Sequence, residues 1–437
     1  MTLLRSPPAL HRFDTPLGPH LMMVDGSRIY AIDPTLDREM DLLAGAAPDA
    51  VLDLLSRHGL SAEGFMTGDL PQDPPMRSLS LAVAQACNLG CTYCYAQQGN
   101  FGGAEANMGW DVARDALTGL IDSAAPGEQV KIAFLGGEPL ANRALVRRAT
   151  EFAKALAGER GVQAAFAITT NGTLVGPDDA AFFARHRFAV TVSMDGNEEL
   201  HDQQRPFRNG RGSYRRILAN LAPLLGQGEA LQVSARVTVT PRNLALRETL
   251  DHLIGLGFHS VGFSPVLKTP TGTDELQTPD IDVLLEQMIA CGEAFTAKMI
   301  AGETYPFSNM QTALRELHRG THRPYPCGAG AGYFGVSATG GLFACHRFVE
   351  DPAGAMGNVT DGVDRAAQRQ WLESRAVDRQ EPCRQCWARY LCGGGCHHEV
   401  IHRGRPACDY IRGWLSYCLQ AYVVLGERAP GLFAARP

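Results

Sequence analysis

The sequence has no long apolar run and no large excess of charge of one sign. No stretch reaches the ~18 apolar residues of a membrane-spanning helix, so no membrane association is expected. The 40 basic and 46 acidic residues leave a net charge of −6, which argues against a nucleic-acid partner because such partners usually require a basic face. The opening residues MTLLRSPPALHRFDTPLG lack the apolar segment of a secretory signal. We therefore expect a cytoplasmic protein.

Cysteine is abundant, with 12 residues. Disulfides rarely persist in the cytoplasm, so this number needs another explanation. The cysteines lie in two groups, at 87–94 and from 327 to 418, and only Cys291 stands apart. Short spacings between clustered cysteines indicate metal ligands.

The N-terminal part of the chain, residues 1–75, is expected to be a small separate α+β unit. Apolar residues flank the turn signal DGS at 25–27 and predict a hairpin, after which two short helices follow. The proline-rich PQDPP at 71–75 marks the boundary. An exposed hairpin edge can accept an added strand, so this unit is a candidate peptide-recognition element.

Residues 76–266 alternate six strand-like runs with helical segments. Six β–α repeats imply a parallel sheet with right-handed crossovers, either a partial barrel or an open doubly wound sheet, since a closed eight-fold barrel needs two more repeats. Residues 267–325 carry an apolar helical stripe that is expected to bridge two domains. Residues 326–437 are rich in glycine and cysteine before a final helix, so we expect metal to hold this segment together.

Three cysteines follow the first strand of the repeat region, in CNLGCTYCYA (87–96). Ligands of parallel sheets bind at the carboxyl ends of strands, so Cys87, Cys91 and Cys94 are well placed for chemistry. One alternative is a zinc site completed by a distant residue. The CxxxCxxC spacing, with Tyr93 before the last cysteine, resembles that of radical S-adenosylmethionine (SAM) enzymes. The resemblance implies that the three catalytic cysteines hold a [4Fe–4S] cluster, whose fourth iron binds SAM and cleaves it to a hydrogen-abstracting radical.

Residues at the ends of the later strands fit the same resemblance. GGEP (136–139) resembles the motif that holds the SAM amino group, with Glu138 as the acceptor. Ser193 and Asp195 are expected to contact ribose or carboxylate, and Arg236 to pair with the SAM carboxylate. The complete expected SAM-binding set is Tyr93, Gly136, Gly137, Glu138, Pro139, Asn171, Ser193, Asp195 and Arg236. Taken singly, such residues are more often helix caps or surface charges.

The C-terminal cysteines resemble those of the SPASM domain, which carries two auxiliary [4Fe–4S] clusters; a zinc ribbon is the alternative. The resemblance assigns Cys327, Cys345 and Cys396 to the first auxiliary cluster and Cys383, Cys386, Cys392 and Cys408 to the second. One iron of the first cluster then lacks a cysteine, and a substrate thiolate is our hypothesis for that site. Cys291 and Cys418 fit apolar helical stripes and are expected in the core. Three clusters and SAM are thus the expected cofactors.

The expected function is that of a peptide maturase, because SPASM enzymes mostly modify peptides or proteins. Residues 201–214 resemble a segment that is common in peptide-modifying radical SAM enzymes. The resemblance implies that His201 or Arg205 contacts SAM or the substrate; a structural role in the loop is the alternative. The C-terminal region resembles thioether-forming maturases of the quinohemoprotein amine dehydrogenase type. The expected partners are a substrate peptide or small protein subunit and a reductant such as flavodoxin or ferredoxin.

Two alternatives remain. An anaerobic sulfatase maturase, which oxidises cysteine or serine to formylglycine, typically has an acidic residue where this chain has His346. It also typically has a further cysteine near the position of Tyr333. The second alternative is a non-catalytic iron–sulfur or zinc scaffold.

Overall fold

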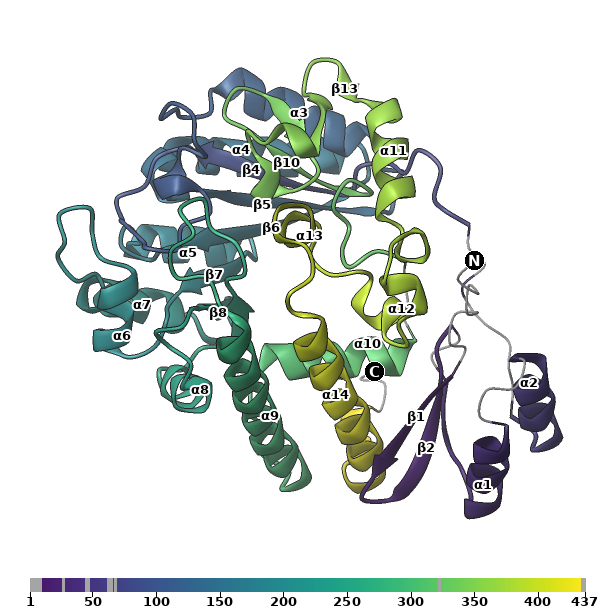
Figure 1. Cartoon of the computed structure of the whole chain (residues 1–437). Helices are drawn as coiled ribbons and strands as arrows, with labels where there is room; N and C mark the ends of the chain where they lie inside the picture. The colour runs from purple at the N-terminus through teal and green to yellow at the C-terminus, as the bar shows by residue number, and fades with distance from the viewer. Residues whose placement is uncertain are drawn as a thin grey trace.

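The computed structural model describes residues 10–25, 28–43, 48–60, 66, 69–320 and 324–433. The N-terminal unit is a three-stranded antiparallel sheet in the order β1-β2-β3, followed by two helices (Figure 1). Its elements are β1 (Leu10–Thr15), β2 (Gly18–Met23), β3 (Arg28–Ala31), α1 (Pro34–Leu42) and α2 (Pro48–Arg57). The expected hairpin is the β2–β3 pair, whose turn residues 26 and 27 lie outside the described residues. Sequence analysis missed β1.

The described chain next forms a parallel sheet whose strands β4 to β9 are neighbours in sequence order. The strands are β4 (Ser78–Ala84), β5 (Gln129–Gly136), β6 (Gln163–Thr170), β7 (Ala189–Ser193), β8 (Gln232–Val239) and β9 (Ser260–Pro265). The intervening helices are α3 (Trp110–Asp122), α4 (Arg143–Glu159), α5 (Pro177–Arg185), α6 (Glu198–Gln204), α7 (Tyr214–Leu225) and α8 (Leu246–Gly255). The sheet is a partial barrel, as the resemblance implied, and the open doubly wound sheet is excluded.

Alternating side chains decide which face of each strand packs against the helices. In β8, Val233, Ala235 and Val237 are buried, whereas Arg236 between them is exposed. Successive strand residues point to opposite faces, so one face packs under the helices and the other lines the open interior of the barrel. The strand sequences therefore place polar side chains such as Arg236 toward the interior, where a ligand can reach them.

The C-terminal region extends the same sheet. Strand β10 pairs parallel with β4, and β11, β12 and β13 continue antiparallel from it. Its elements are β10 (Tyr333–Val336), β11 (Gly341–Phe343), β12 (Ala355–Asn358), β13 (Gly362–Val363), α11 (Arg365–Arg375), α12 (Arg389–Cys392), α13 (His397–Arg403) and α14 (Cys408–Arg428). This region is thus fixed to the barrel through backbone hydrogen bonds, which sequence analysis did not foresee.

Helices α9 (Thr278–Ile300) and α10 (Ser308–Arg319) connect the barrel to the C-terminal region. Helix α9 runs beside α14 (Figure 1). The two helices approach closely at glycines: a Cβ added to Gly292 would lie 2.3 Å from the Tyr417 ring, and one added to Gly413 would lie 2.5 Å from Leu285. Cys291 and Cys418 are both fully buried in this core, as expected, and the Cys418 thiol contacts the Met310 sulfur at 3.9 Å.

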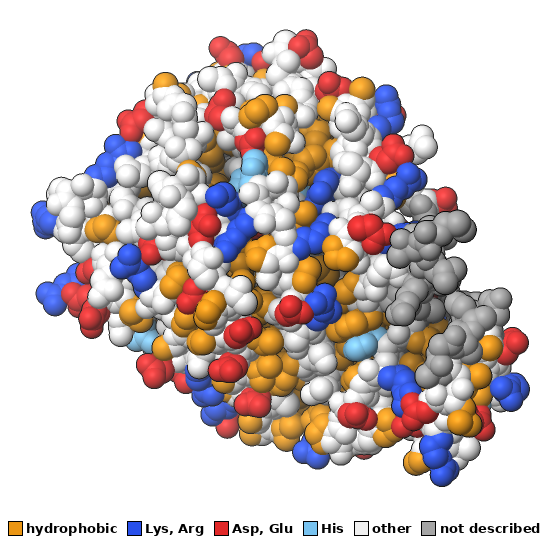
Figure 2. All heavy atoms as spheres, viewed as in Figure 1, with side chains coloured by type: hydrophobic (Ala, Val, Ile, Leu, Met, Phe, Trp, Pro, Cys, Tyr) orange, Lys and Arg blue, Asp and Glu red, His pale blue; other side chains and the backbone are white. Residues whose placement is uncertain are grey.

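Basic and acidic side chains are interspersed on the face shown in Figure 2, without a broad surface of one sign. Across the described ranges, none of the helices combines the length and the apolar character needed to cross a membrane.

Candidate functional site

The three N-terminal cysteines lie in one loop beyond the carboxyl end of β4, and each is half-buried. Burial raises the pKa of the Cys91 thiol to about 12, with a smaller contribution from neighbouring Cys94 and Cys87, whereas Arg205 acts in the opposite direction. Backbone amides donate to the other two sulfurs, from Leu89 to Cys87 at 3.4 Å and from Gln98 to Cys94 at 3.3 Å. Thiolates are the ligands of iron–sulfur clusters, and amide donors with a nearby cation favour thiolates. The donor set therefore fits a cluster.

Paired glycines pack the loop against the end of β5. A Cβ on Gly137 would lie 2.2 Å from the Ala86 carbonyl oxygen, and one on Gly136, at φ +145°, would lie 2.2 Å from that of Ala84. Only glycine allows this approach without displacing the backbone. The glycines therefore bring the backbone of GGEP directly behind Cys87. Their contact with SAM stays a prediction.

Glu138 is fully buried and ties the ends of β5 and β6 together. Its carboxylate accepts from the Asn171 amide at 2.7 Å, the Leu140 amide at 3.0 Å and the Thr170 hydroxyl at 2.8 Å, and burial raises its pKa. The Asn171 side-chain amide continues the chain of contacts to Asn88 at 2.9 Å and to the Cys87 sulfur at 3.6 Å. Pro139 starts the short 3-10 turn that follows. Glu138 thus already has three protein donors, and its expected bond to the SAM amino group stays a prediction.

A second buried network fixes the other side of the loop. The Tyr93 hydroxyl donates to Asp195, which is fully buried, and Arg205 donates to the same hydroxyl. The Asp195 carboxylate also accepts from the Thr238 amide at 2.9 Å. The Asp195 amide donates to His201 at 3.3 Å, and burial lowers the pKa of this histidine to about 3. Tyr93, Asp195, Arg205 and His201 therefore position the cysteine loop on the ends of β7 and β8.

Ser193 and Arg236 are neighbours in the β7–β8 register and lie on the interior face of the barrel. Among the described residues, no acidic side chain forms an ion pair with Arg236, and its surroundings lower the pKa of the guanidinium by desolvation. A guanidinium without a carboxylate partner inside a barrel suits an anionic ligand group. This placement is compatible with the expected SAM carboxylate site.

The C-terminal cysteines fall into two groups. Cys327, Cys345 and Cys396 are neighbours: burial, followed by the proximity of the other two thiols, raises the pKa of Cys345 to about 12. Cys383, Cys386, Cys392 and Cys408 line one cavity of about 370 Å³, which Cys396 of the first group also lines. The structure therefore brings together the residues of each expected auxiliary cluster, and the donor sets fit such clusters. Their ligand roles stay predictions.

Aromatic and basic side chains connect the first auxiliary group to the barrel, and sequence analysis missed two of them, Tyr95 and Arg347. The Tyr95 ring lies 5.9 Å from that of His346, and Arg347 lies 5.4 Å over Tyr95. His346 contacts the Tyr333 hydroxyl through Nδ1 at 2.6 Å. The sequence did contain a signal for Tyr95, because this residue directly follows Cys94 of the cysteine loop.

Comparison with known proteins identifies the class of this fold and site. Residues 81–253 match the family model of the Radical SAM superfamily. These residues form a radical SAM domain, and the chain has the radical SAM α/β fold followed by a cysteine-rich C-terminal region. The domain implies SAM and one [4Fe–4S] cluster as cofactors.

Within this class, the chain is similar to sulfatase-maturating enzymes. It is 26% identical over 358 residues to the serine-type anaerobic sulfatase-maturating enzyme of Klebsiella aerogenes, covering 78% of this chain and 85% of that protein. It is 32% identical over 157 residues to the cysteine-type enzyme of Clostridium novyi (strain NT), covering 33% and 40%. The solved structure "Native anSMEcpe with bound AdoMet and Kp18Cys peptide" superposes with a TM-score of 0.66 at 18% identity, covering 80% of this chain and 99% of that one.

These similarities overturn the expectation of a thioether-forming maturase, which is wrong: two serine-type sulfatase-maturating enzymes are each 26% identical to this chain over 358 residues. The expectation rested partly on Tyr333 and His346, which were weighed as two separate departures from that group. In the structure these two side chains contact each other, so they are not independent of one another.

Proposed function

We propose that this protein is a peptide- or protein-modifying maturase that oxidises a cysteine or serine side chain to formylglycine. The observation that supports this most is the 358-residue alignment with a sulfatase-maturating enzyme, which extends well beyond the radical SAM domain at 81–253. The similarity therefore includes regions outside the part that all radical SAM enzymes share.

The chain's own residues would act as follows. Cys87, Cys91 and Cys94 would hold the cluster, and bound SAM would supply a carbon radical for hydrogen abstraction. The Tyr93–Asp195–Arg205 network holds this loop in place, and Arg236 would bind the SAM carboxylate. Cys327, Cys345 and Cys396 would hold one auxiliary cluster. Cys383, Cys386, Cys392 and Cys408 in the 370 Å³ cavity would hold the other, and such clusters transfer electrons.

The substrate side chain would enter between the cysteine loop and the first auxiliary group. Tyr95, His346 and Arg347 come together there, and Arg347 is also bound to Glu399. The rings of Tyr95 and His346 would exclude water from the reacting carbon and hold the peptide against the barrel interior. Strand β3, an edge strand of the described N-terminal sheet, would hold a distal part of the peptide by strand addition.

The test is incubation of the reconstituted enzyme, under anaerobic conditions, with SAM, a reductant and cysteine- or serine-containing peptides from proteins encoded beside its gene. We expect 5′-deoxyadenosine and a peptide aldehyde that reacts with a hydrazide; the cysteine peptide loses its sulfur, and the serine peptide loses two hydrogens. Cys91→Ala is the matched negative control. A cysteine product that keeps its sulfur, lacks an aldehyde and has a blocked thiol would refute the proposal.

A further inference from the structure

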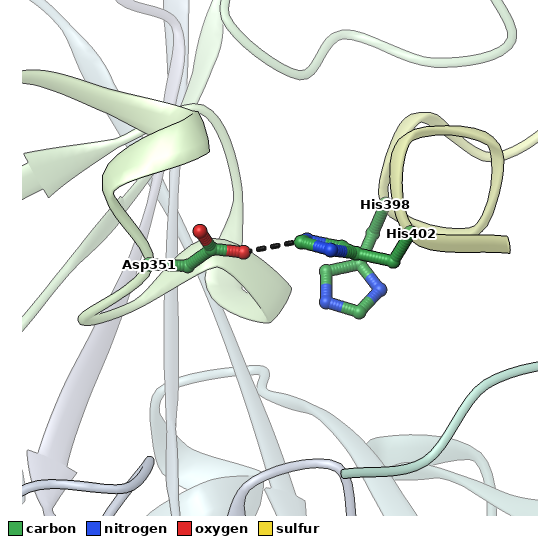
Figure 3. Close-up of side chains that lie close together, drawn as sticks. All are labelled: Asp351, His398 and His402. Atoms are coloured by element: carbon green, nitrogen blue, oxygen red, sulfur yellow. Dashed lines mark hydrogen bonds and ion pairs between the residues drawn. The ribbon is translucent and has the colours of Figure 1, made fainter. Parts of the chain in front are cut away.

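Three potential metal ligands outside the cysteine groups converge within the C-terminal region (Figure 3). His398 and His402 lie on α13, and Asp351 lies in the segment between β11 and β12. The His402 Nε2 atom lies 2.7 Å from the Asp351 Oδ2 atom. One ligand atom from each of the three side chains falls within 4.8 Å of the other two.

The sequence HHEVIHR explains the pair of imidazoles. Residues four apart on a helix share a face, so His398 and His402 stand one above the other, with ring centroids 4.6 Å apart. The preceding His397 points elsewhere: its Nδ1 atom contacts Arg375 at 3.1 Å and its ring packs 5.2 Å from Trp371. Only the i and i+4 histidines therefore face Asp351.

The carboxylate of Asp351 is held in position by its own turn. Its Oδ1 atom accepts from the Ala353 amide at 3.0 Å, which leaves Oδ2 directed at His402. A hydrogen bond from the protein to one carboxylate oxygen orients metal-binding carboxylates in this way.

One ring nitrogen of His398 is available to bind a metal, and the nearby positive charge of Arg347, which would repel a cation, is neutralised. The Nδ1 atom of His398 is buried and has no hydrogen-bond partner among the residues that the structure describes. A buried polar atom without a partner is unfavourable unless an ion or water occupies the site. The positive charge of Arg347 reaches His398, but this guanidinium is paired with Glu399 on the same helix. The cluster therefore offers two imidazoles and one carboxylate beside a neutralised arginine.

We propose that Asp351, His398 and His402 bind a Zn²⁺ ion. Imidazole and carboxylate are common zinc ligands, and two ligand atoms about 2.1 Å from one ion lie at most about 4.2 Å apart. Small side-chain rotations bring the observed set into that range. Three protein ligands leave one position of a tetrahedral ion for water.

The zinc ion would join two segments that each follow a cysteine of the first auxiliary group. Asp351 is six residues beyond Cys345, and His398 is two residues beyond Cys396. Phe348 already packs 5.0 Å from the His398 ring, so the two segments are in contact without the ion. The ion would fix their separation and with it the spacing of the two cysteines. The site does not depend on the proposed oxidation of a peptide.

The test is elemental analysis and zinc K-edge X-ray absorption of the full-length, cluster-loaded protein after equilibration with buffered Zn²⁺. We expect one zinc per chain, with nitrogen and oxygen neighbours that include imidazole scattering and no sulfur near about 2.3 Å. His402→Gln should lower zinc affinity by more than about tenfold at unchanged iron content. His58→Gln is the control and should leave zinc affinity unchanged. His58 contacts Glu39 at 3.1 Å in a comparable His–carboxylate pair outside this cluster.

Asp351→Asn keeps an oxygen that accepts from His402 but removes the charge, so it tests the site even if a histidine variant folds poorly. It too should weaken zinc binding by roughly tenfold or more. The proposal is overturned if the wild-type protein takes up no zinc, if its zinc has sulfur ligands, or if His402→Gln and Asp351→Asn both bind zinc as the wild type does.

Discussion

The hydroxyl of Tyr333 and the Nδ1 atom of His346 lie 2.6 Å apart, on strand β10 and in the turn after Cys345. The same hydroxyl lies 2.8 Å from the Ser80 hydroxyl on β4, so the contact also connects the C-terminal region to the first strand of the barrel. Tyr333 and His346 stand where sulfatase maturases were expected to have a cysteine and an acidic residue. A hydrogen-bonded pair therefore replaces both groups between the barrel and the first auxiliary site.

Tyr333→Phe tests this pair. The variant leaves His346 and Ser80 without their shared partner, which should lower the free energy of unfolding by about 1–2 kcal/mol. We expect SAM cleavage to continue and the yield of modified peptide to fall, because the pair lies toward the auxiliary group. Thermal unfolding and parallel assays of 5′-deoxyadenosine and peptide aldehyde check both parts. An unchanged aldehyde yield would show that the Tyr333–His346 pair has no role in modification of the peptide.

Replacing Cys91 with alanine should abolish SAM cleavage. The cluster would lose one of the three thiolates in the β4 loop, and chromatography of 5′-deoxyadenosine measures the loss. Cys291→Ala is the matched control, since this thiol is fully buried on α9 and should have no effect on cleavage. Normal cleavage by the Cys91 variant would contradict the assignment of the loop.

Tyr93→Phe should impair SAM cleavage without removing any expected cluster ligand. The substitution deprives the buried Asp195 carboxylate of its hydroxyl donor, at a cost of about 1–3 kcal/mol, and loosens the cysteine loop. Thermal unfolding and the rate of 5′-deoxyadenosine formation report the two effects. Tyr214→Phe is the control, because it removes a hydroxyl contact to His252 away from the loop. Equal effects of both variants would show that Tyr93 has no special positioning role.

Arg236→Met should raise the dissociation constant for SAM by about 10- to 100-fold, since a hydrogen bond to a charged group contributes about 1.5–3 kcal/mol. Equilibrium binding of SAM to the anaerobic protein measures this constant. Arg242→Met removes an arginine that is paired with Asp274 at 2.7 Å and should leave SAM affinity unchanged. If Arg236→Met binds SAM normally but loses peptide affinity, Arg236 serves the substrate.

Replacing Cys383 should spare part of SAM cleavage and stop formation of the modified peptide, because Cys383 belongs to the group in the 370 Å³ cavity and not to the β4 loop. Iron content and both product assays give the result. A full yield of modified peptide would refute the assignment of this cysteine to an auxiliary cluster.

Acid should destabilise the protein through His201. Burial lowers the pKa of His201 from 6.5 to about 3, so between these values the unfolded chain binds a proton that the folded chain does not. Stability from this group is therefore full above about pH 6.5 and falls as the pH is lowered, by about 1 kcal/mol between pH 7 and 5.5. Thermal unfolding of wild type and His201→Gln over this range should show a shallower pH dependence for the variant. The exposed His318→Gln should behave as the wild type.

The choice of reaction shows where the sequence alone misled. The amino acids at 333 and 346 favoured a thioether-forming enzyme, because each departs from the pattern expected for sulfatase maturases. The similarity along most of the chain outweighs them.

The sequence by itself determined the features that depend on short spacing. The β–α repeats, the residues of most strands, the three-cysteine loop and the burial of Cys291 and Cys418 all follow from periodicities and motifs within a few turns of chain. Only the tertiary structure decided how distant segments meet. The pairing of β10 with β4, the use of the Glu138 and Asp195 carboxylates by the protein itself, and the convergence of Asp351 with His398 and His402 depend on the packing of segments far apart in the sequence. Local periodicity fixes which face of an element is buried, but it does not specify the partner against which that face packs.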